Sequence, residues 1–324
     1  MCPRIDPADS LRLVFMGTPD FAVPSFYALA ESETLAGVVT QPDRPKGRKG
    51  ILTPPPIKTA ASERQIPILQ PERLKKSSEV AAFLADLNLH LIVVVAFGQI
   101  LPENILKIPR YGCINVHASL LPKYRGAGPI QWAIINGETH TGITTMLMDA
   151  GMDTGPILLQ EAIPIGPDET AASLSSRLSK AGAGLLLKTI GALKEGTLLP
   201  KPQDDVLASH APLLKKEAGW VDWGETAPSI YNRWRALLPW PGLTTVYKQA
   251  RWKLVSLEVG AGTGHYGKPG EIFRRSEHGL EVAAGHGYII IKALQPEGKR
   301  EMTPSEYAAG HRIDAGSILS PCKR

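Results

Sequence analysis

Apolar residues in the first 200 positions fall into two kinds of segment. Short runs are continuous, and residues 91–97 (LIVVVAF) contain no polar side chain, which is typical of a strand buried on both faces of a sheet. Longer segments, such as residues 77–87 and those after Thr170, space apolar residues three or four positions apart, which predicts helices. Alternating strands and helices predict an α/β domain with a Rossmann-like, doubly wound, mostly parallel sheet. Further strand-like runs cover residues 11–16, 35–40, 112–117 and 141–149.

The pattern changes near residue 200. Residues 198–212 contain three prolines, two adjacent aspartates and no periodicity, so we interpret residues 201–214 as a linker. A helix is expected at 227–238, and five short strand-like runs with glycine-rich turns follow it. Such a series predicts a small five-stranded β-barrel of the OB-like type. The strand-like runs cover residues 244–247, 252–259, 271–273, 280–284 and 288–294.

We therefore expect an α/β domain over residues 1–200, the linker over 201–214, and a C-terminal barrel domain over 215–324. The barrel domain also contains a capping box, in which Thr303 is followed three positions later by Glu306. Pro304 stands at the first helical position, where its missing N–H costs nothing. This combination predicts a short helix that begins directly after Thr303.

The composition is that of an ordinary globular protein, with 43% hydrophobic and 21% charged residues. No apolar stretch approaches the roughly 20 residues that a membrane span needs. The first ten residues lack the apolar segment of a signal peptide, so we expect a cytoplasmic protein without a membrane partner. The three cysteines and eight histidines show no ligand spacing, and we expect no metal.

The positive charge is concentrated in the last third of the chain. Residues 209–324 hold 16 Lys and Arg against 11 Asp and Glu, which leaves 20 of each kind in residues 1–208 from the totals of 36 and 31. Such asymmetry indicates either a polyanionic partner such as a nucleic acid or a solvated basic face.

Residues 262–267 (GTGHYG) match the glycine pattern of dinucleotide-binding loops. That interpretation requires a strand before the motif and a helix after it, within the α/β part of the chain. The match lies instead in the barrel part and precedes another strand-like run. We therefore interpret it as a surface loop and expect no nicotinamide cofactor.

The residues suited to chemistry follow two strands of the α/β part. Asn115 and His117 stand two positions apart on a predicted strand, so their side chains face the same way. About thirty residues on, glycines flank Asp153 in a predicted loop after the next strand. An amide, an imidazole and a carboxylate together suit acyl transfer to an amine, because they can stabilise an oxyanion and move protons.

Each of these residues also has a purely structural interpretation. Asn115 can cap a turn, His117 can be a structural core histidine, and Asp149 can be the functional carboxylate in place of Asp153. The glycine-flanked position favours Asp153, since Asp149 closes a strand.

Residues 114–126 (INVHASLLPKYRG) and 151–155 (GMDTG) closely resemble the signature of the formyltransferases that use 10-formyltetrahydrofolate. The resemblance implies that Asn115, His117 and Asp153 form the catalytic trio. It implies that the folate lies beside the turn formed by Ser119, Leu120, Leu121 and Pro122. It also implies that main-chain groups near Gln99, Ile100 and Leu101 bind the pteridine.

The trio is shared by relatives that formylate a purine precursor, a nucleotide sugar or water, so two other features bear on the acceptor. Residues 40–58 are similar to a basic loop of the methionyl-tRNA formyltransferases, and the alternative is a disordered polar loop. The basic C-terminal part is similar to the tRNA-binding domain of that group, through residues 239–242 (PWPG) and 294–299 (LQPEGK). The residues implied in tRNA binding are Lys46, Arg48, Lys49 and Lys216.

The resemblance, which extends from about residue 11 to residue 313, implies transfer of a formyl group from 10-formyltetrahydrofolate to the α-amino group of methionyl initiator tRNA, for translation initiation. We expect a monomer. Two alternatives stay open, namely a formyltransferase acting on a nucleotide-linked amino sugar and an RNA-binding protein on an inactive scaffold. The basic C-terminal part argues against the first, and the complete trio argues against the second.

Overall fold

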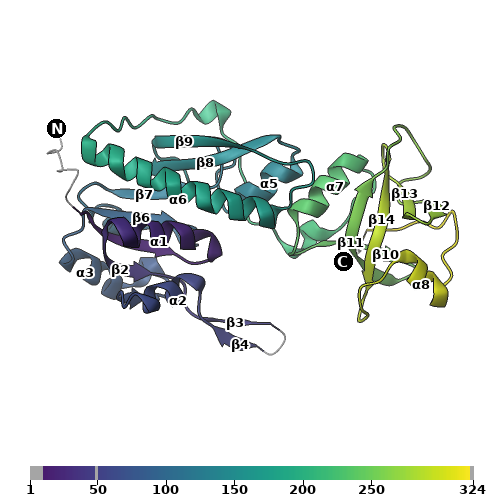
Figure 1. Cartoon of the computed structure of the whole chain (residues 1–324), viewed down its shortest axis with the longest axis horizontal. Helices are drawn as coiled ribbons and strands as arrows, with labels where there is room; N and C mark the ends of the chain where they lie inside the picture. Colours follow the sequence, from purple (N-terminus) through teal and green to yellow (C-terminus); the bar gives the residue numbers. More distant parts are fainter. Residues whose placement is uncertain (1–9, 48–49, 322–324) are drawn as a thin grey trace. The chain divides into compact units, whose positions relative to one another are not determined.

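The computed structural model describes residues 10–47 and 50–321 of the chain (Figure 1). Its internal contacts divide it into two compact units. The first unit comprises Met1–Pro129, His140–Pro164 and Leu174–Pro212, and the second comprises Ile130–Thr139, Ile165–Ser173 and Leu213–Arg324. Residues 198–212, which the sequence pattern assigns mainly to a linker, thus belong to the first unit, and two segments from the α/β part of the sequence belong to the second.

The first unit is built on a seven-stranded sheet with the order β5-β2-β1-β6-β7-β8-β9. The five strands from β5 to β7 pair in parallel, and β8 and β9 continue the sheet in antiparallel fashion. The predicted mostly parallel sheet is therefore confirmed, while β9 is a strand that the sequence pattern did not indicate. The strands are β1 (Arg12–Gly17), β2 (Thr34–Val39), β5 (Ile68–Leu69), β6 (Leu91–Val95), β7 (Cys113–His117), β8 (His140–Leu147) and β9 (Ile157–Pro164).

Helices cover both faces of this sheet. On one face Val80 and Leu84 of α3 join a core with Val14 and Ile92. On the other face Phe26 of α1 packs edge-on against Phe15 of β1. The helices and 3-10 turns of this unit are η1 (Asp20–Ala22), α1 (Val23–Ser32), α2 (Pro56–Glu63), η2 (Leu74–Lys76), α3 (Ser78–Asp86), α4 (Glu103–Leu106), η3 (Asp205–Leu207) and most of α6 (Ala171–Glu195).

The position of α6 decides which face of β7 is free for chemistry. A side chain at Gly182 of α6 would lie 3.1 Å from Val116, so the helix packs closely on the face that bears Val116. Asn115 and His117 point to the opposite face, because side chains alternate along a strand. Cys113, on that same opposite face, is 1% exposed and belongs to the core.

The basic loop of the first unit contains a short antiparallel hairpin. Its strands are β3 (Arg44–Lys46) and β4 (Ile51–Thr53), which Figure 1 shows extending from the purple part of the chain. The base of the hairpin is held by the ion pair of Asp43 with Lys58 at 2.8 Å. Ile51 and Leu52 are each 63% exposed, so the hairpin presents apolar as well as basic side chains.

The second unit contains a five-stranded antiparallel sheet with the order β10-β11-β14-β13-β12. The last described residues of the chain bridge the two edge strands of this sheet. Ser320 pairs with Val246 of β10, and Ile318 pairs with Glu271 beside β12. This arrangement confirms the predicted five-stranded domain. The strands are β10 (Leu243–Tyr247), β11 (Ala250–Val259), β12 (Ile272–Ser276), β13 (Gly279–Ala283) and β14 (Tyr288–Pro296).

The core of the second unit is rich in large side chains, among them Trp252 with 0% and Tyr247 with 2% exposure. The predicted capping box is confirmed, because the Thr303 hydroxyl and the Glu306 carboxylate each accept a hydrogen bond from the other's main-chain N–H. The motif at 262–267 lies in a loop between β11 and β12, as expected. Helical elements are α5 (Pro129–Ile135), η4 (Lys216–Gly219), α7 (Ala227–Ala236) and α8 (Pro304–Gly310).

Over residues 10–47 and 50–321, no helix is long and apolar enough to cross a membrane.

Candidate active site

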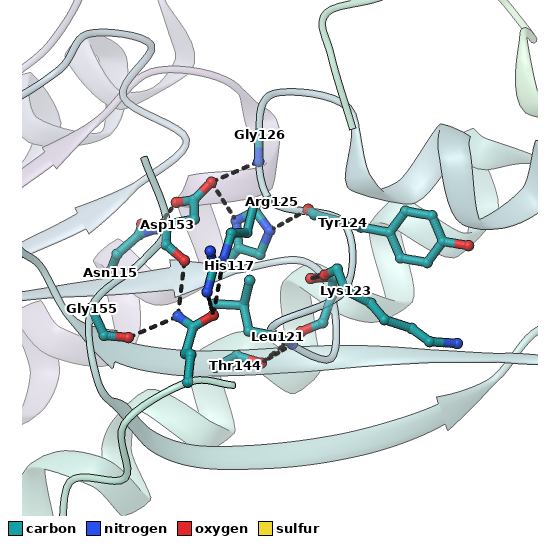
Figure 2. A network of polar contacts seen from close by, with 12 residues as sticks. Asn115, His117, Leu121, Lys123, Tyr124, Arg125, Gly126, Thr144, Asp153 and Gly155 are labelled. Atoms are coloured by element: carbon teal, nitrogen blue, oxygen red, sulfur yellow. Dashed lines mark hydrogen bonds and ion pairs between the residues drawn. The ribbon is translucent and has the colours of Figure 1, made fainter. Parts of the chain in front are cut away.

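Asn115, His117 and Asp153 meet at the carboxyl end of β7 (Figure 2). Nδ1 of His117 lies 3.7 Å from Oδ2 of Asp153, and Nδ2 of Asn115 donates to Oδ1 of the same carboxylate at 3.4 Å. Asn115 is 9% and His117 6% exposed. The structure therefore brings together the three side chains that the sequence proposes, on one face of the strand.

The main chain determines which nitrogen of His117 carries a hydrogen. Nε2 lies 2.9 Å from the carbonyl oxygen of Tyr124, which can only accept. Nε2 is therefore the donor, and Nδ1 faces Asp153. In the neutral ring Nδ1 holds a lone pair, and in the protonated ring it places a positive charge beside the carboxylate. His117 can thus take up and release a proton on the side of Asp153.

Asp153 is held in an uncommon backbone conformation, with φ of 56°. Its Oδ2 accepts a hydrogen bond from the main-chain N–H of Gly126 at 2.8 Å. Gly155 is required in this loop, because a Cβ there would lie 1.7 Å from the carbonyl oxygen of Leu147. Asp149 lies elsewhere in the loop, where its Oδ1 accepts from Gly151 and Thr154.

Two residues of the site were not found by sequence reasoning. Arg125, only 7% exposed, and Gln203 join the Asp153 loop to the loop that contacts His117. Arg125 lies within the family motif of residues 114–126, so the sequence contained a signal that could have identified it. Gln203 lies in the segment interpreted as a linker, and its partners other than Arg125 are main-chain carbonyls, which leave no trace in a sequence motif.

The turn from Ser119 to Pro122 follows β7 directly and is fixed from the neighbouring strands. The hydroxyl of Thr144 donates to the carbonyl of Ser119 at 2.7 Å, and the Gln160 amide donates to the carbonyl of Leu121 at 2.9 Å. Ser119 and Leu121 are buried, and Leu120 and Pro122 are half-buried. The Ser119 hydroxyl donates to the carbonyl of Lys123, so it serves the turn itself.

Residues Gln99, Ile100 and Leu101 follow the central strand β6, next to β7 in the sheet. The Gln99 side chain accepts a hydrogen bond from the main-chain N–H of Leu74 and donates one to the carbonyl of Pro71. Leu101 is 2% exposed and belongs to the core. No main-chain group of residues 99–101 makes a hydrogen bond with another described residue. Ile100 is 66% exposed, so the main chain beside it is open to a ligand, whereas Leu101 is buried and the Gln99 side chain already has partners.

Of the cations proposed to bind tRNA, Lys46 is exposed on β3 and Lys216 is exposed at the start of η4. Arg48 and Lys49 lie outside the described residues.

A groove of about 200 Å³ lies on the sheet of the second unit. Thr244, Lys253 and Gln295 stand side by side across β10, β11 and β14 and line it, together with Arg251. Lys253 and Arg251 point to the same face of β11, because they are two positions apart. Glu297 also lines the groove, and its carboxylate lies 3.9 Å from Arg251. The groove therefore presents two cations, one carboxylate and two uncharged polar side chains.

Cys113 lies on the same strand as Asn115 and His117. Burial raises the pKa of its thiol to about 12, so it stays protonated at neutral pH. Within the described part of the chain, no group of three His, Cys, Asp or Glu side chains is arranged to hold a metal ion.

The fold and this site define a formyl transferase. The sequence profile of the formyl transferase family matches residues 11–190, and that of the formyl transferase C-terminal domain matches residues 213–312. A solved sugar 3-N-formyl transferase, crystallised with dTDP and 5-N-formyl-THF, has a TM-score of 0.64 at 20% identity, over 90% of this chain and 100% of that one. HypX from Aquifex aeolicus, solved with tetrahydrofolic acid, has a TM-score of 0.62 at 16% identity, over 98% of this chain and 51% of that one. These likenesses concern the fold.

Sequence relatives define the group more narrowly. The methionyl-tRNA formyltransferase of Geobacter sulfurreducens is 50% identical over 310 residues, which cover 95% of this chain and 96% of the relative. That of Trichlorobacter lovleyi is 49% identical over 311 residues, which cover 96% of this chain and 97% of the relative. The chain belongs to the methionyl-tRNA formyltransferase family.

Proposed function

We propose that this chain transfers the formyl group of 10-formyltetrahydrofolate to the α-amino group of methionyl initiator tRNA. The observation that carries the proposal is the trio of Asn115, His117 and Asp153 in a chain that is 45–50% identical to methionyl-tRNA formyltransferases over at least 95% of its length. The sugar formyl transferases share the fold at far lower identity.

In the proposed reaction the neutral amine of the methionyl ester attacks the formyl carbon. A new C–N bond forms, and the carbonyl oxygen becomes an oxyanion. The Asn115 amide has two hydrogens, one of which is directed to Asp153, so the second can stabilise the oxyanion. Loss of one such preorganised donor typically slows a reaction by a factor of about 10²–10³.

The amine must lose a proton, and the folate nitrogen N10 must gain one as its bond to the formyl carbon breaks. Nδ1 of His117 and the Asp153 carboxylate face one another at 3.7 Å and form the proton-accepting pair. The separation exceeds a direct hydrogen bond, and a substrate atom or a water placed to one side of the pair can hydrogen-bond both groups. The proton held there then passes to N10, and tetrahydrofolate leaves.

The folate is proposed to bind at the carboxyl ends of the central strands, beside the turn of Ser119, Leu120, Leu121 and Pro122. Main-chain groups near Gln99, Ile100 and Leu101 are proposed to hydrogen-bond the pteridine, since they have no partner among the described residues and Ile100 is 66% exposed. This assignment uses the backbone and not the Gln99 side chain, which holds the neighbouring loop.

The tRNA is proposed to bind through Lys46, Arg48, Lys49 and Lys216, with Arg251 and Lys253 of the second unit as further phosphate contacts. Phosphates dominate the affinity of proteins for nucleic acids, and the exposed Lys46 of the hairpin and Arg251 of the groove, with the half-buried Lys253 beside it, suit that role. We further propose a cytoplasmic monomer in which residues 1–200 form the catalytic domain and residues 215–324 form the tRNA-binding domain.

The test is transfer of labelled formyl from 10-formyltetrahydrofolate to charged initiator tRNA, in parallel with charged elongator methionine tRNA and an amino-sugar nucleotide. We expect transfer to the initiator tRNA at a rate well above that to the other two acceptors. Equal transfer to the sugar nucleotide, or none to tRNA while the folate is consumed, would refute the acceptor assignment.

A further inference from the structure

Gln203, in the segment that follows α6, reaches both loops that orient the catalytic side chains. We propose that Gln203 is a positioning residue for formyl transfer, which fixes the Asp153 loop against the loop of residues 124–126. The inference rests on the proposed function, because it concerns the geometry of the same site.

The first contact is with the Asp153 loop. The Gln203 amide Nε2 donates to the carbonyl of Asp153 at 2.8 Å and to that of Gly155 at 2.7 Å. An amide has two hydrogens, so both bonds form at once. Asp153 has φ of 56°, a region that residues with a side chain rarely occupy, so outside contacts are needed to hold it there.

The second contact is with Arg125. Oε1 of Gln203 accepts from Nε of Arg125 at 3.1 Å and from its Nη2 at 2.9 Å. Arg125 is 7% exposed, and its guanidinium also donates to Asp205 at 2.8 Å. The amide of Gln203 thus uses its donor side for one loop and its acceptor side for the other.

Arg125 stands between the two main-chain groups that orient the trio. The carbonyl of Tyr124 lies 2.9 Å from Nε2 of His117, and the N–H of Gly126 donates to Asp153 at 2.8 Å. A guanidinium held in place therefore holds both contacts in place. Gln203 thereby influences the separation of His117 and Asp153 without touching either side chain.

The backbone around Gln203 is itself fixed to the same parts of the site. Lys201 pairs with Ile157, just after the Asp153 loop, and His210 pairs with Arg125. Gln203 lies between these two pairings, so its side chain starts from a fixed position. A glutamine on a free linker could not supply the same constraint.

The expected effect follows from the sensitivity of catalysis to geometry. A misplacement of about 1 Å can cost a factor of about 100 in rate. We therefore expect loss of the Gln203 bonds to lower kcat about 10- to 100-fold, with both KM values within about threefold of wild type. Because the Asp153–His117 pair moves, the pH profile of kcat should also shift.

Two variants test this in the full-length protein. Gln203→Glu keeps the shape and the acceptor for Arg125 but replaces the donor with an oxygen that repels the two carbonyls. Gln203→Met keeps the length, removes donor and acceptor, and adds no charge. Val206→Glu is the matched control, because it adds one negative charge to the same segment at a side chain that is 89% exposed.

The measurements are kcat, both KM values, the pH profile of kcat, and the thermal midpoint of each variant. A lower kcat and a shifted pH profile in both Gln203 variants, with Val206→Glu like wild type, would support the proposal. Wild-type kcat in both, or a loss that follows the folded fraction with an unshifted pH profile, would overturn it. Failure of the wild-type protein to formylate methionyl-tRNA would instead refute the proposed function, and it is measured first.

Discussion

The imidazole of His117 is held between two oxygens, with Nε2 at 2.9 Å from the Tyr124 carbonyl and Nδ1 at 3.7 Å from the carboxylate of Asp153. Because a carbonyl cannot donate, the proton-exchanging nitrogen is the one that faces Asp153. The carboxylate and the ring therefore act as one unit, and a change at either should affect the same step.

The first prediction separates Asp153 from Asp149. Asp153→Asn removes the charge beside His117, and we expect kcat to fall by about 10² or more, with small changes in KM. Asp149→Asn keeps an oxygen that can still accept from Gly151 and Thr154, so we expect near wild-type kcat. Steady-state formylation of methionyl-tRNA measures both. A larger loss in the Asp149 variant would show that Asp149, and not Asp153, is the catalytic carboxylate.

The second prediction concerns the groove of the second unit. The double variant Arg251→Ala and Lys253→Ala removes two cations that lie on one face of β11. We expect weaker tRNA binding. The logarithm of the association constant should also fall less steeply with the logarithm of the salt concentration, by about one to two in slope, since each lost phosphate contact changes that slope by about 0.9. The folate KM should not change.

Lys107→Ala is the control for this measurement. Lys107, directly after α4, is 75% exposed and pairs with Glu103 four positions before it, so its loss also removes a surface cation. If the control reduced the salt slope by as much per charge, net charge and not the groove would determine the binding.

The third prediction uses the pH dependence of the last helix. A hydrogen bond from Arg300 and one from the main chain of Thr303 hold the pKa of Glu306 below its usual value. A carboxyl with a lowered pKa contributes stability above its unfolded pKa of about 4.3, and this contribution is lost as pH falls through the folded value. The wild-type protein should thus be more stable than Glu306→Gln at pH 7, and the difference should vanish in acid. Denaturant midpoints of both proteins at pH 7 and at pH 3 measure this, and a difference that persists at pH 3 would contradict it.

Much of the fold could be predicted because its signals are local. The strand of residues 91–95 is buried on both faces, so an unbroken apolar run reveals it. β9 (ILLQEAIP), by contrast, has apolar residues at 157–159 and 162–163, a spacing that fits a helix as well as a strand. The hairpin of β3 and β4 was also missed, because β3 consists of basic and proline residues and each strand is only three residues long.

The site was predictable only where function depends on side chains in a compact motif. Asn115 and His117 share one strand, so their common orientation follows from the period of two. The contact of Gln203 with Asp153 joins positions 50 residues apart through a main-chain carbonyl. Any residue type has such a carbonyl, so nothing in the sequence marks the partner. For the same reason the segment around Gln203 resembles a linker although it is part of the first unit.

The last prediction concerns Cys113, on the same face of β7 as Asn115 and His117. Burial raises the pKa of its thiol to about 12, and the side chain is 1% exposed. In a protein whose other two cysteines are replaced by serine, we expect alkylation at pH 8 to be at least about 100-fold slower when folded than in denaturant, because only the thiolate reacts. Cys113→Ala should keep most of the formylation activity, since the thiol belongs to the core and not to the trio.

A buried thiol of this kind also makes stability depend on alkaline pH. Its pKa is raised on folding, so the protonated form favoured in the folded protein contributes fully below the unfolded pKa of about 8.5 to 9. The contribution then falls as pH rises toward the folded value of about 12, because the unfolded chain ionises first. The wild-type protein should therefore lose more stability than Cys113→Ala between pH 8 and pH 10. An equal loss of stability in the two proteins, or rapid alkylation of the folded chain, would contradict this prediction. Either result would show that the Cys113 thiol is accessible to solvent and that its surroundings on β7 are packed more loosely than in the structure.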